Sequence, residues 1–299
     1  MASAEGVGTV VGLWRFPVKS MAGEQIAEAE LTERGLVGDR CYALVDVQTG
    51  KVVSAKSVKL FPDILACQAR FVEPPRAGQE APPVRIVLPD GTAVVSDATE
   101  TDRVLSAHFG REVTLARTAP ESFTIDQYHP DVEGADPAGH RDTVIEAKVG
   151  SAFFADAGVA SPVPVGAFFD LFPVSVLTTS TLDQLRASRP QSVIDERRFR
   201  MNVIVGTTAP GFIENGWVHH DLGIGTTARL HVAMPDPRCV MTTLAQGDLP
   251  RDTEVLRTLV KHNSLPVGDG GRFPCAGVYA VVGAGGTLRT GDVVALDQR

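Results

Sequence analysis

The sequence predicts a mainly β protein with a few short helices, in which an N-terminal β domain precedes a C-terminal barrel-like sheet. Short runs rich in β-branched and aromatic residues recur in both halves and are separated by Gly, Pro and Asp. Segments with helical spacing are few and short. A chain dominated by strands favours a barrel or a barrel-like sheet. Its 299 residues suffice for one large or two ordinary domains.

The N-terminal part, residues 1–120, is expected to be the first β domain. Its expected strands are residues 7–16, 26–31, 41–47, 64–72, 84–88, 92–96 and 112–116. Between the fifth and sixth of these strands lies Pro-Asp-Gly at 89–91, which is a strong hairpin signal. A helix is expected over residues 97–109. Asp97 or Thr99 can cap its start, and Gly110 can end it.

Residues 121–168 are expected to connect the two domains. The stretch 128–140 is polar and turn-rich and has no clear hydrophobic period. Such a segment is either a mobile tether or a flap over a functional site, because long ordered loops often serve function. The sequence leaves both interpretations open.

The C-terminal part, residues 169–299, is expected to form the barrel. Its expected strands are residues 174–177, 199–205 and 228–234, its expected helices are 181–187 and 253–263, and a closing hairpin is expected from residues 277–282 and 287–296. Gly291-Asp292 is the turn signal near that hairpin. We expect the first strand of the chain to contact both parts.

Composition excludes several classes of function. Acidic side chains outnumber basic ones by 36 to 28, and a net charge of −8 disfavours general nucleic-acid binding. No apolar run reaches the roughly 18 residues of a membrane span, and no signal peptide is recognisable, so we expect a cytoplasmic protein without membrane contact. The four cysteines form no CxxC pair, which gives no support to a cysteine zinc site.

The segment Met-Pro-Asp-Pro-Arg-Cys-Val-Met-Thr-Thr at 234–243 is the most informative one for chemistry. A strand is expected to end there, and two prolines should stiffen the turn that presents Arg238 and Cys239 together. A neighbouring guanidinium favours the thiolate, which is both a nucleophile and a soft metal ligand. The alternative is that Cys239 is a small buried hydrophobic residue.

Two further segments offer polar side chains for a ligand. Lys19 and Ser20 follow the first strand, and Arg40 could provide a planar fork for a phosphate; ordinary surface cations are the alternative. Arg200 and Asn202 have the i, i+2 spacing that places both on one face of a strand. They could line a site or form an internal structural network.

These segments, in this order, resemble the MOSC superfamily, specifically its members with an N-terminal MOSC β-barrel domain, which include the amidoxime-reducing component and its soluble bacterial relatives. The likeness covers most of the chain. It rests on Pro-Val-Lys-Ser at 17–20, Gly-Asp-Arg at 38–40, Asp-Leu-Phe-Pro at 170–173, Val-Leu-Thr at 176–178, Phe-Arg-Met-Asn at 199–202, Trp217, Leu-Gly-Ile-Gly at 222–225, Arg-Cys at 238–239, Thr-Thr at 242–243 and Gly-Asp-Val-Val at 291–294.

The resemblance implies a molybdenum cofactor, molybdopterin, and a role for each matching residue. Cys239 would be the protein ligand to molybdenum or, in sulfur-transferring members, the carrier of a persulfide. Asp170 would lie close to the metal and handle protons or position water. The pterin and its phosphate would be held by Lys19, Ser20, Arg40, Arg200, Asn202 and Arg238, and Thr178 and Thr179 would line the same pocket.

Three functions follow from this resemblance. The first is reduction of N-hydroxylated or N-oxide compounds by a molybdenum-dependent oxidoreductase. A separate electron-transfer protein would then be needed, since no ferredoxin-like domain follows residue 299. The second is sulfur transfer through a persulfide on Cys239 without molybdenum. The third is a non-catalytic carrier of the cofactor. For the two enzymatic functions we expect the substrate to be a small molecule.

Overall fold

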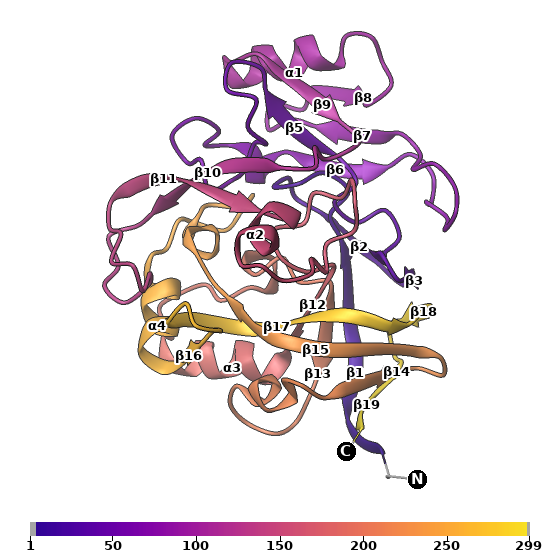
Figure 1. The fold of residues 1–299 in the computed structure, drawn as a ribbon, viewed down its shortest axis with the longest axis vertical. Helices are drawn as coiled ribbons and strands as arrows, with labels where there is room; N and C mark the ends of the chain where they lie inside the picture. Colours follow the sequence, from indigo (N-terminus) through magenta and orange to yellow (C-terminus); the bar gives the residue numbers. More distant parts are fainter. Residues whose placement is uncertain (1–3, 298–299) are drawn as a thin grey trace.

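A closed seven-stranded barrel forms one end of the protein in the computed structural model, which describes residues 4–297 (Figure 1). Each strand pairs with the next, and the pairing of the first with the last closes the ring. Around the barrel the strands are β12 (Val174–Thr178), β13 (Val203–Gly206), β1 (Ala4–Arg15), β19 (Val293–Asp297), β14 (Asp221–Ile224), β15 (Ala228–Pro237) and β17 (Arg272–Ala284). The predicted mainly β fold is confirmed.

The first strand of the chain is an integral part of the C-terminal barrel. β1 runs antiparallel to both β13 and β19, and its last residues also pair with β2 (Glu24–Ile26). The first strand therefore contacts both parts, as expected. Consequently the barrel combines residues from the two ends of the chain.

Apolar side chains from all sides fill the barrel interior. Leu13, Val176, Val203, Leu222 and Val278 are each 0% exposed. This alternation of inward apolar residues along each strand is what a small barrel requires. β12 and β13 run parallel, and a parallel pair needs a crossover connection. The helix α3 (Thr179–Ser188) lies in that connection, close to the predicted position.

Short helices cover one flank of the barrel. α4 (Glu254–His262) buries Val255, Leu256 and Leu259 and packs against β17 and the 3-10 helix η4 (Val240–Thr243). The predicted helix at 253–263 is thereby confirmed. Two further 3-10 helices are η2 (Glu196–Arg198) and η3 (Ile213–Trp217). Among residues 4–297, no helix is long and apolar enough to cross a membrane.

Small sheets and one helix form the second part of the protein. Most of it packs around an apolar core that includes Val18, Leu44, Ile64, Ile86 and Leu105. The exceptions are Ala29, Leu31 and Leu36, which pack with the barrel core. The elements are β3 (Glu28–Thr32), β4 (Gly35–Leu36), β5 (Ala43–Asp46), η1 (Ile64–Ala66), β6 (Gln68–Phe71), β7 (Val84–Val87), β8 (Ala93–Val95), α1 (Thr101–Phe109) and β9 (Val113–Ala116). β6, β7 and β8 form one sheet and β5 pairs with β9.

The segment expected to be a connection contains regular structure. β10 (Phe123–His129) and β11 (Thr143–Val149) form an antiparallel hairpin, which α2 (Ser151–Asp156) follows. β10 also lies against residues 52–56, because Val52 N donates to Thr124 O (3.1 Å) and Tyr128 N donates to Lys56 O (2.9 Å). Residues 130–142, between the two strands, and residues 157–168, after α2, contain no helix or strand.

Several element predictions were wrong at least in part. The strand expected at residues 64–72 begins as the 3-10 helix η1, and only Gln68–Phe71 is extended. α1 begins at Thr101 rather than at residue 97, and neither Asp97 nor Thr99 caps it. The expected closing hairpin does not form. Instead β17 pairs with β15, β12 and β16 (Ser264–Pro266), whereas β18 (Gly286–Arg289) pairs with β3. Local turn signals could not reveal these partners, because β18 pairs with β3 and β19 (Val293–Asp297) pairs with β1, both far away in sequence.

Candidate functional site

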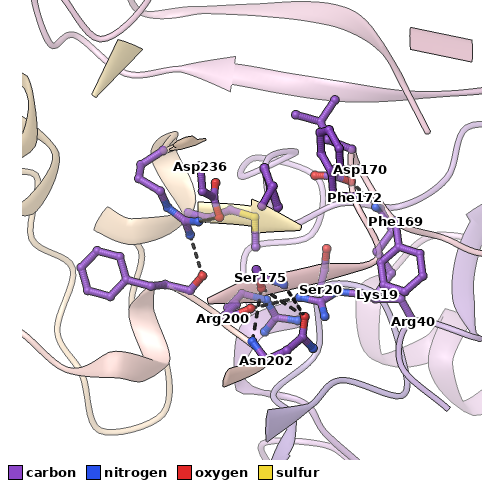
Figure 2. A pocket seen from close by; sticks show the side chains of 15 residues that line it. Lys19, Ser20, Arg40, Phe169, Asp170, Phe172, Ser175, Arg200, Asn202 and Asp236 are labelled. Carbon is purple, nitrogen blue, oxygen red and sulfur yellow. Dashed lines mark hydrogen bonds and ion pairs between the residues drawn. The ribbon is translucent and has the colours of Figure 1, made fainter. Parts of the chain in front are cut away.

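A polar cavity lies where the barrel meets the second part of the protein. Its volume is about 80 Å³. The lining residues are Lys19, Ser20, Arg40, Phe169, Asp170, Leu171, Phe172, Ser175, Phe199, Arg200, Asn202, Asp236, Arg238, Met241 and Tyr279. In Figure 2, Asp170 and Phe172 lie across the cavity from Asp236, and Ser20, Arg200 and Asn202 lie below them.

Backbone hydrogen bonds bring the two N-terminal motifs together at this cavity. Lys19 N donates to Tyr42 O, and Arg40 N donates to Phe16 O, each at 2.8 Å. The residues that follow β1 therefore run beside the residues that precede β5. As a result Lys19 and Arg40, which are far apart in sequence, line the same cavity.

Three of the cavity residues have a left-handed backbone conformation. The φ angles are 67° at Ser20, 48° at Arg40 and 55° at Arg200. Between residues 4 and 297 only five non-glycine residues have positive φ, and these three belong to one site. Such a conformation costs on the order of 1–3 kcal/mol per residue and clusters at binding and active sites. The cluster therefore marks the cavity as functional.

Arg200 is a buried guanidinium without an anionic partner. Its exposed fraction is 7%, and within residues 4–297 its side chain forms no ion pair or side-chain hydrogen bond. Its guanidinium lies 4.4 Å from the centroid of the Phe16 ring. Burial, and then the nearby Arg40, lower the pKa of Arg200 to about 9. Asp39 and Asp170 act in the opposite direction without pairing with it, so the guanidinium is available to an anionic ligand.

The strand predicted at residues 199–205 is wrong at its start. β13 begins only at Val203, and Arg200 lies in the turn before it. The argument that Arg200 and Asn202 share one face of a strand therefore fails. The two side chains still line the same cavity, because the left-handed turn redirects Arg200.

Arg40 is fixed in place by Asp39. The two side chains form an ion pair, and Arg40 Nη2 also donates to Arg200 O at 3.0 Å. Asp39 is itself held, since its carboxylate accepts from Phe16 N at 2.7 Å and from Asn202 Nδ2 at 2.9 Å. Arg40 is thus preorganised on one wall of the cavity, beside the unpaired Arg200.

Asn202 both lines the cavity and belongs to an internal hydrogen-bond network, which are the two alternatives that the sequence left open. Its Oδ1 accepts from both N and Oγ of Ser175 at 3.1 Å, and its Nδ2 donates to Asp39 and to Trp14 O. Asn202 therefore positions the residues around it.

Asp170 lies between two lysines. Its carboxylate pairs with Lys19 Nζ on one side and with Lys56 Nζ, at 2.9 Å, on the other. Burial acts to raise the pKa of Asp170, but the two ammonium groups outweigh it and hold this pKa well below its usual range. Lys19 Nζ also donates to Phe168 O at 2.7 Å. Asp170 is therefore a fixed carboxylate at neutral pH.

A second carboxylate in the cavity behaves differently. Asp236 is 1% exposed, and burial raises its pKa to about 6, although Arg238 acts in the opposite direction. Arg238 Nη1 lies 2.5 Å from Asp236 Oδ2, and Arg238 Nη2 donates to Phe199 O at 2.6 Å. Asp236 Oδ1 and Arg238 Nε, both buried, have no hydrogen-bond partner. One unsatisfied acceptor and one unsatisfied donor thus remain beside the cavity.

Cys239 is half-buried directly before η4, in an extended conformation. It does not itself belong to the lining of the cavity, but its neighbours Arg238 and Met241 do. Electrostatic interaction links Cys239 to Lys56 and Arg238. Burial raises the pKa of each of the other three thiols, Cys41, Cys67 and Cys275, to about 12.

The backbone around Cys239 is stiff for a reason that differs from the predicted one. β15 does not end at Met234 but continues to Pro237, and the register shifts near the prolines. Proline is tolerated in strands at such irregularities. After the cysteine, the fully buried Arg198 donates to Leu244 O at 3.2 Å and to Pro250 O at 2.8 Å.

Two residues expected at the pocket lie elsewhere. Thr178 is fully buried, caps α3 and donates to the Glu214 carboxylate at 2.6 Å. Thr179 donates to Thr207 O at 3.4 Å. Neither belongs to the lining of the cavity. β12 runs from the cavity toward α3, so these residues at its far end are carried away from Ser175.

The sequence analysis did not identify several residues of the site. Asp236 lies in the segment 234–243 that was expected to carry chemistry, but nothing in the sequence indicates that its side chain is buried. Lys56 and Tyr279 had none either: each becomes important only because another segment folds against it. Leu171 and Phe172 follow Asp170, so proximity in sequence could have indicated them.

The donor set fits a molybdenum–pterin cofactor. Arg200 lacks an anion, and Asp236 Oδ1 and Arg238 Nε lack partners. These groups suit a phosphate and a polar ring system, while a thiolate suits a soft metal. The cavity is smaller than the roughly 300–1,000 Å³ of common ligand pockets, so such a ligand would also occupy its open mouth.

Cationic side chains converge on this cavity, and the half-buried Cys239 directly follows one of them, Arg238, in the sequence. Residues 7–108 match the family described as MOSC N-terminal beta barrel domain, and residues 165–295 match the MOSC domain. The chain therefore belongs to the proteins that combine these two MOSC domains. The predicted resemblance is confirmed.

Several known proteins are similar to this chain. The chain is 24% identical to "Mitochondrial amidoxime-reducing component 1" of Homo sapiens, over 97% of this chain and 83% of the relative. It is also 24% identical to "Mitochondrial amidoxime reducing component 2" of Rattus norvegicus, over 96% and 83%. The solved YUAD protein from Bacillus subtilis covers 100% of both chains, with 12% identity and a TM-score of 0.46. The MOSC domain and the named relatives suggest a molybdenum-cofactor-binding domain.

Proposed function

We propose that this protein is a molybdenum-cofactor-dependent reductase of N-hydroxylated or N-oxide compounds, with the cofactor held through Cys239. The observation that carries the proposal is the unpaired, buried Arg200 in a cavity whose other cations are already neutralised or fixed. Arg200 lies on a left-handed turn, and two other such turns lie beside it. Backbone strain of this kind clusters at binding sites, which supports ligand binding here. The named relatives support the reaction class.

The cationic residues would bind and orient the cofactor. Arg200 and Lys19 would face its anionic groups, and Arg40, held in place by Asp39, would lie beside them. Arg238 offers one unsatisfied N–H to the same ligand. The Cys239 thiolate would be the soft ligand to molybdenum. When bound, the cofactor supplies two-electron redox chemistry at the metal.

The two carboxylates, Asp170 and Asp236, would have different roles in proton transfer. Asp170 stays ionised between its lysines, so it can orient water or substrate but cannot donate a proton near neutral pH. Asp236 has a pKa of about 6 and can exchange a proton in that range. Reduction of an N–O bond consumes protons, and Asp236 is the group of the cavity whose pKa suits that task.

Metal analysis tests the proposal. Protein from a molybdopterin-competent host should contain nearly one molybdenum per chain, and C239S should lose it. C41S is the matched control, because Cys41 is also a half-buried free thiol but lies away from η4, and it should keep its molybdenum. Molybdenum absent from the wild type, in a host that loads a control molybdoenzyme, would overturn cofactor binding.

Turnover tests the reaction. The loaded wild type should reduce benzamidoxime with an artificial electron donor, and a basic electron-transfer protein would be the natural partner for a chain of net charge −8. A fully loaded protein that reduces no N-oxygenated compound would refute the reductase and leave the cofactor carrier.

Sulfur transfer is the second candidate, since Lys56 and Arg238 near Cys239 would stabilise a persulfide anion as well as a thiolate. A molybdenum-free protein that gains the mass of one sulfur atom at Cys239 would favour it. An unmodified Cys239 after exposure to a sulfur donor would exclude it.

A further inference from the structure

Two histidines and one aspartate converge at the loop between β10 and β11. His129 ends β10, and Asp136 and His140 lie in the loop. One ligand atom of each lies within 4.8 Å of the corresponding atoms of the other two. We propose that His129, Asp136 and His140 bind a divalent transition-metal ion of the zinc class, at a site distinct from the cofactor cavity.

The distances are close to those of a metal site. Zinc–nitrogen and zinc–oxygen bonds of about 2.0–2.2 Å place neighbouring ligand atoms of a tetrahedral site about 3.3–3.5 Å apart. His129 Nδ1 lies 3.6 Å from Asp136 Oδ2. His140 Nδ1 lies 2.5 Å from the same oxygen and would have to move outward by about 1 Å. Its side chain is 38% exposed, which gives it room to rotate.

The surroundings hold the ligands in place. Asp136 accepts hydrogen bonds from the backbone N of Ala138 (3.3 Å) and of His140 (3.1 Å). The Gln127 amide lies 3.1 Å from His129 Nε2. Turned so that its oxygen faces that nitrogen, Gln127 accepts from the ring N–H, which is the usual support of an imidazole that binds metal through its other nitrogen.

The types of the three ligands also favour an ion of this class. Two imidazoles and one carboxylate suit zinc and its transition-metal neighbours rather than magnesium or calcium. Water would complete the coordination through the exposed side of His140.

The ion would fasten a long loop beside the cofactor cavity. Residues 130–142 contain the loop, and Asp131 O there accepts from Arg257 of α4 at 3.4 Å. The strand before it is bonded to Lys56, whose ammonium group contacts Asp170. A metal at the loop therefore stabilises the strand that supports Lys56 without touching the cavity itself.

Zinc titration of the metal-free protein tests the site. The C239S background is used so that the Cys239 thiol cannot bind zinc. Calorimetry should give one Zn²⁺ per chain, with binding that weakens as acid protonates the histidines. H140A should bind at least about tenfold more weakly. Cobalt in place of zinc should give visible bands without thiolate charge transfer.

H231A is the matched control. His231 pairs with Asp221 at 2.7 Å and its side chain is 36% exposed, but among residues 4–297 it belongs to no group of three possible metal ligands. Its replacement should leave zinc affinity unchanged. Equal zinc affinity in H140A and in the C239S background would overturn the proposal, as would a titration without stoichiometric binding. Neither result depends on molybdenum, so it leaves the proposed reductase function untouched.

Discussion

Replacing Arg200 by methionine should stabilise the cofactor-free protein while it weakens cofactor binding. Burial and the neighbouring Arg40 lower the pKa of Arg200 from its usual value to about 9. At about 1.4 kcal/mol per pH unit, keeping the guanidinium charged inside the folded protein costs on the order of 5 kcal/mol. Because the folded pKa is the lower one, the cost is fully present below pH 9 and fades as the pH rises toward the usual pKa of arginine.

Not all of this cost is recovered by the substitution. The contact with the Phe16 ring at 4.4 Å offsets about 2 kcal/mol, and the variant loses it. Methionine keeps the apolar stem and, like arginine, carries a Cβ, so the strain of the left-handed backbone at φ 55° is unchanged. The net gain in the free energy of unfolding should therefore be about 1–3 kcal/mol near neutral pH.

Urea denaturation of cofactor-free protein and molybdenum analysis of loaded protein measure the two effects. R200M should have the higher unfolding midpoint and the lower metal content. R197M is the control, because Arg197 is exposed and already paired with Asp195 and Asp248, and its removal should not stabilise the protein. An R200M protein that is less stable than wild type and fully loaded would refute the assignment of Arg200 as an anion-binding residue.

Two further substitutions test the supports of the site. D170N leaves Lys19 and Lys56 without their anion and should lower the free energy of unfolding by about 3–5 kcal/mol at neutral pH. Because the pKa of Asp170 is depressed, the wild type loses this advantage as the pH falls below 3.8, and urea denaturation across that range should show the two proteins converge. R198M strips several buried carbonyls of their donor and should cost about 3 kcal/mol in the same assay; unchanged stability would contradict the role of Arg198 at η4.

Local patterns in the sequence were enough to predict the fold class. Alternating apolar residues in short runs specify strands wherever a sheet has one buried face, and α4 was recognisable because Val255, Leu256 and Leu259 share one face. The partners of the strands were not predictable in this way. The chain end was expected to fold on itself, but β19 pairs with β1 and β14, which are separated from it by long stretches of sequence.

At the site, too, the sequence was enough to identify the types of the residues but not how the fold positions them. Lys19, Arg40, Arg200 and Arg238 were identified by their chemistry in ordered motifs, and the fold brings them together. The left-handed turns that aim them have no sequence signal, since arginine and serine rarely adopt such angles. Lys56 was missed for a related reason: it matters only because the hairpin of β10 and β11 presses residues 52–56 toward Asp170.

The shared first strand makes the site independent of any hinge between the two parts. Lys19 follows β1 by only a few residues, and β1 is hydrogen-bonded on both sides within the barrel that carries Arg200 and Arg238. The cations from both parts are therefore fixed to one rigid frame. Removing residues 1–120 as a unit would open the barrel and expose the edges of β13 and β19. A chain beginning at residue 121 would lose the barrel and half of its anion site together, so the part that matches the MOSC domain is not a self-sufficient folding unit here.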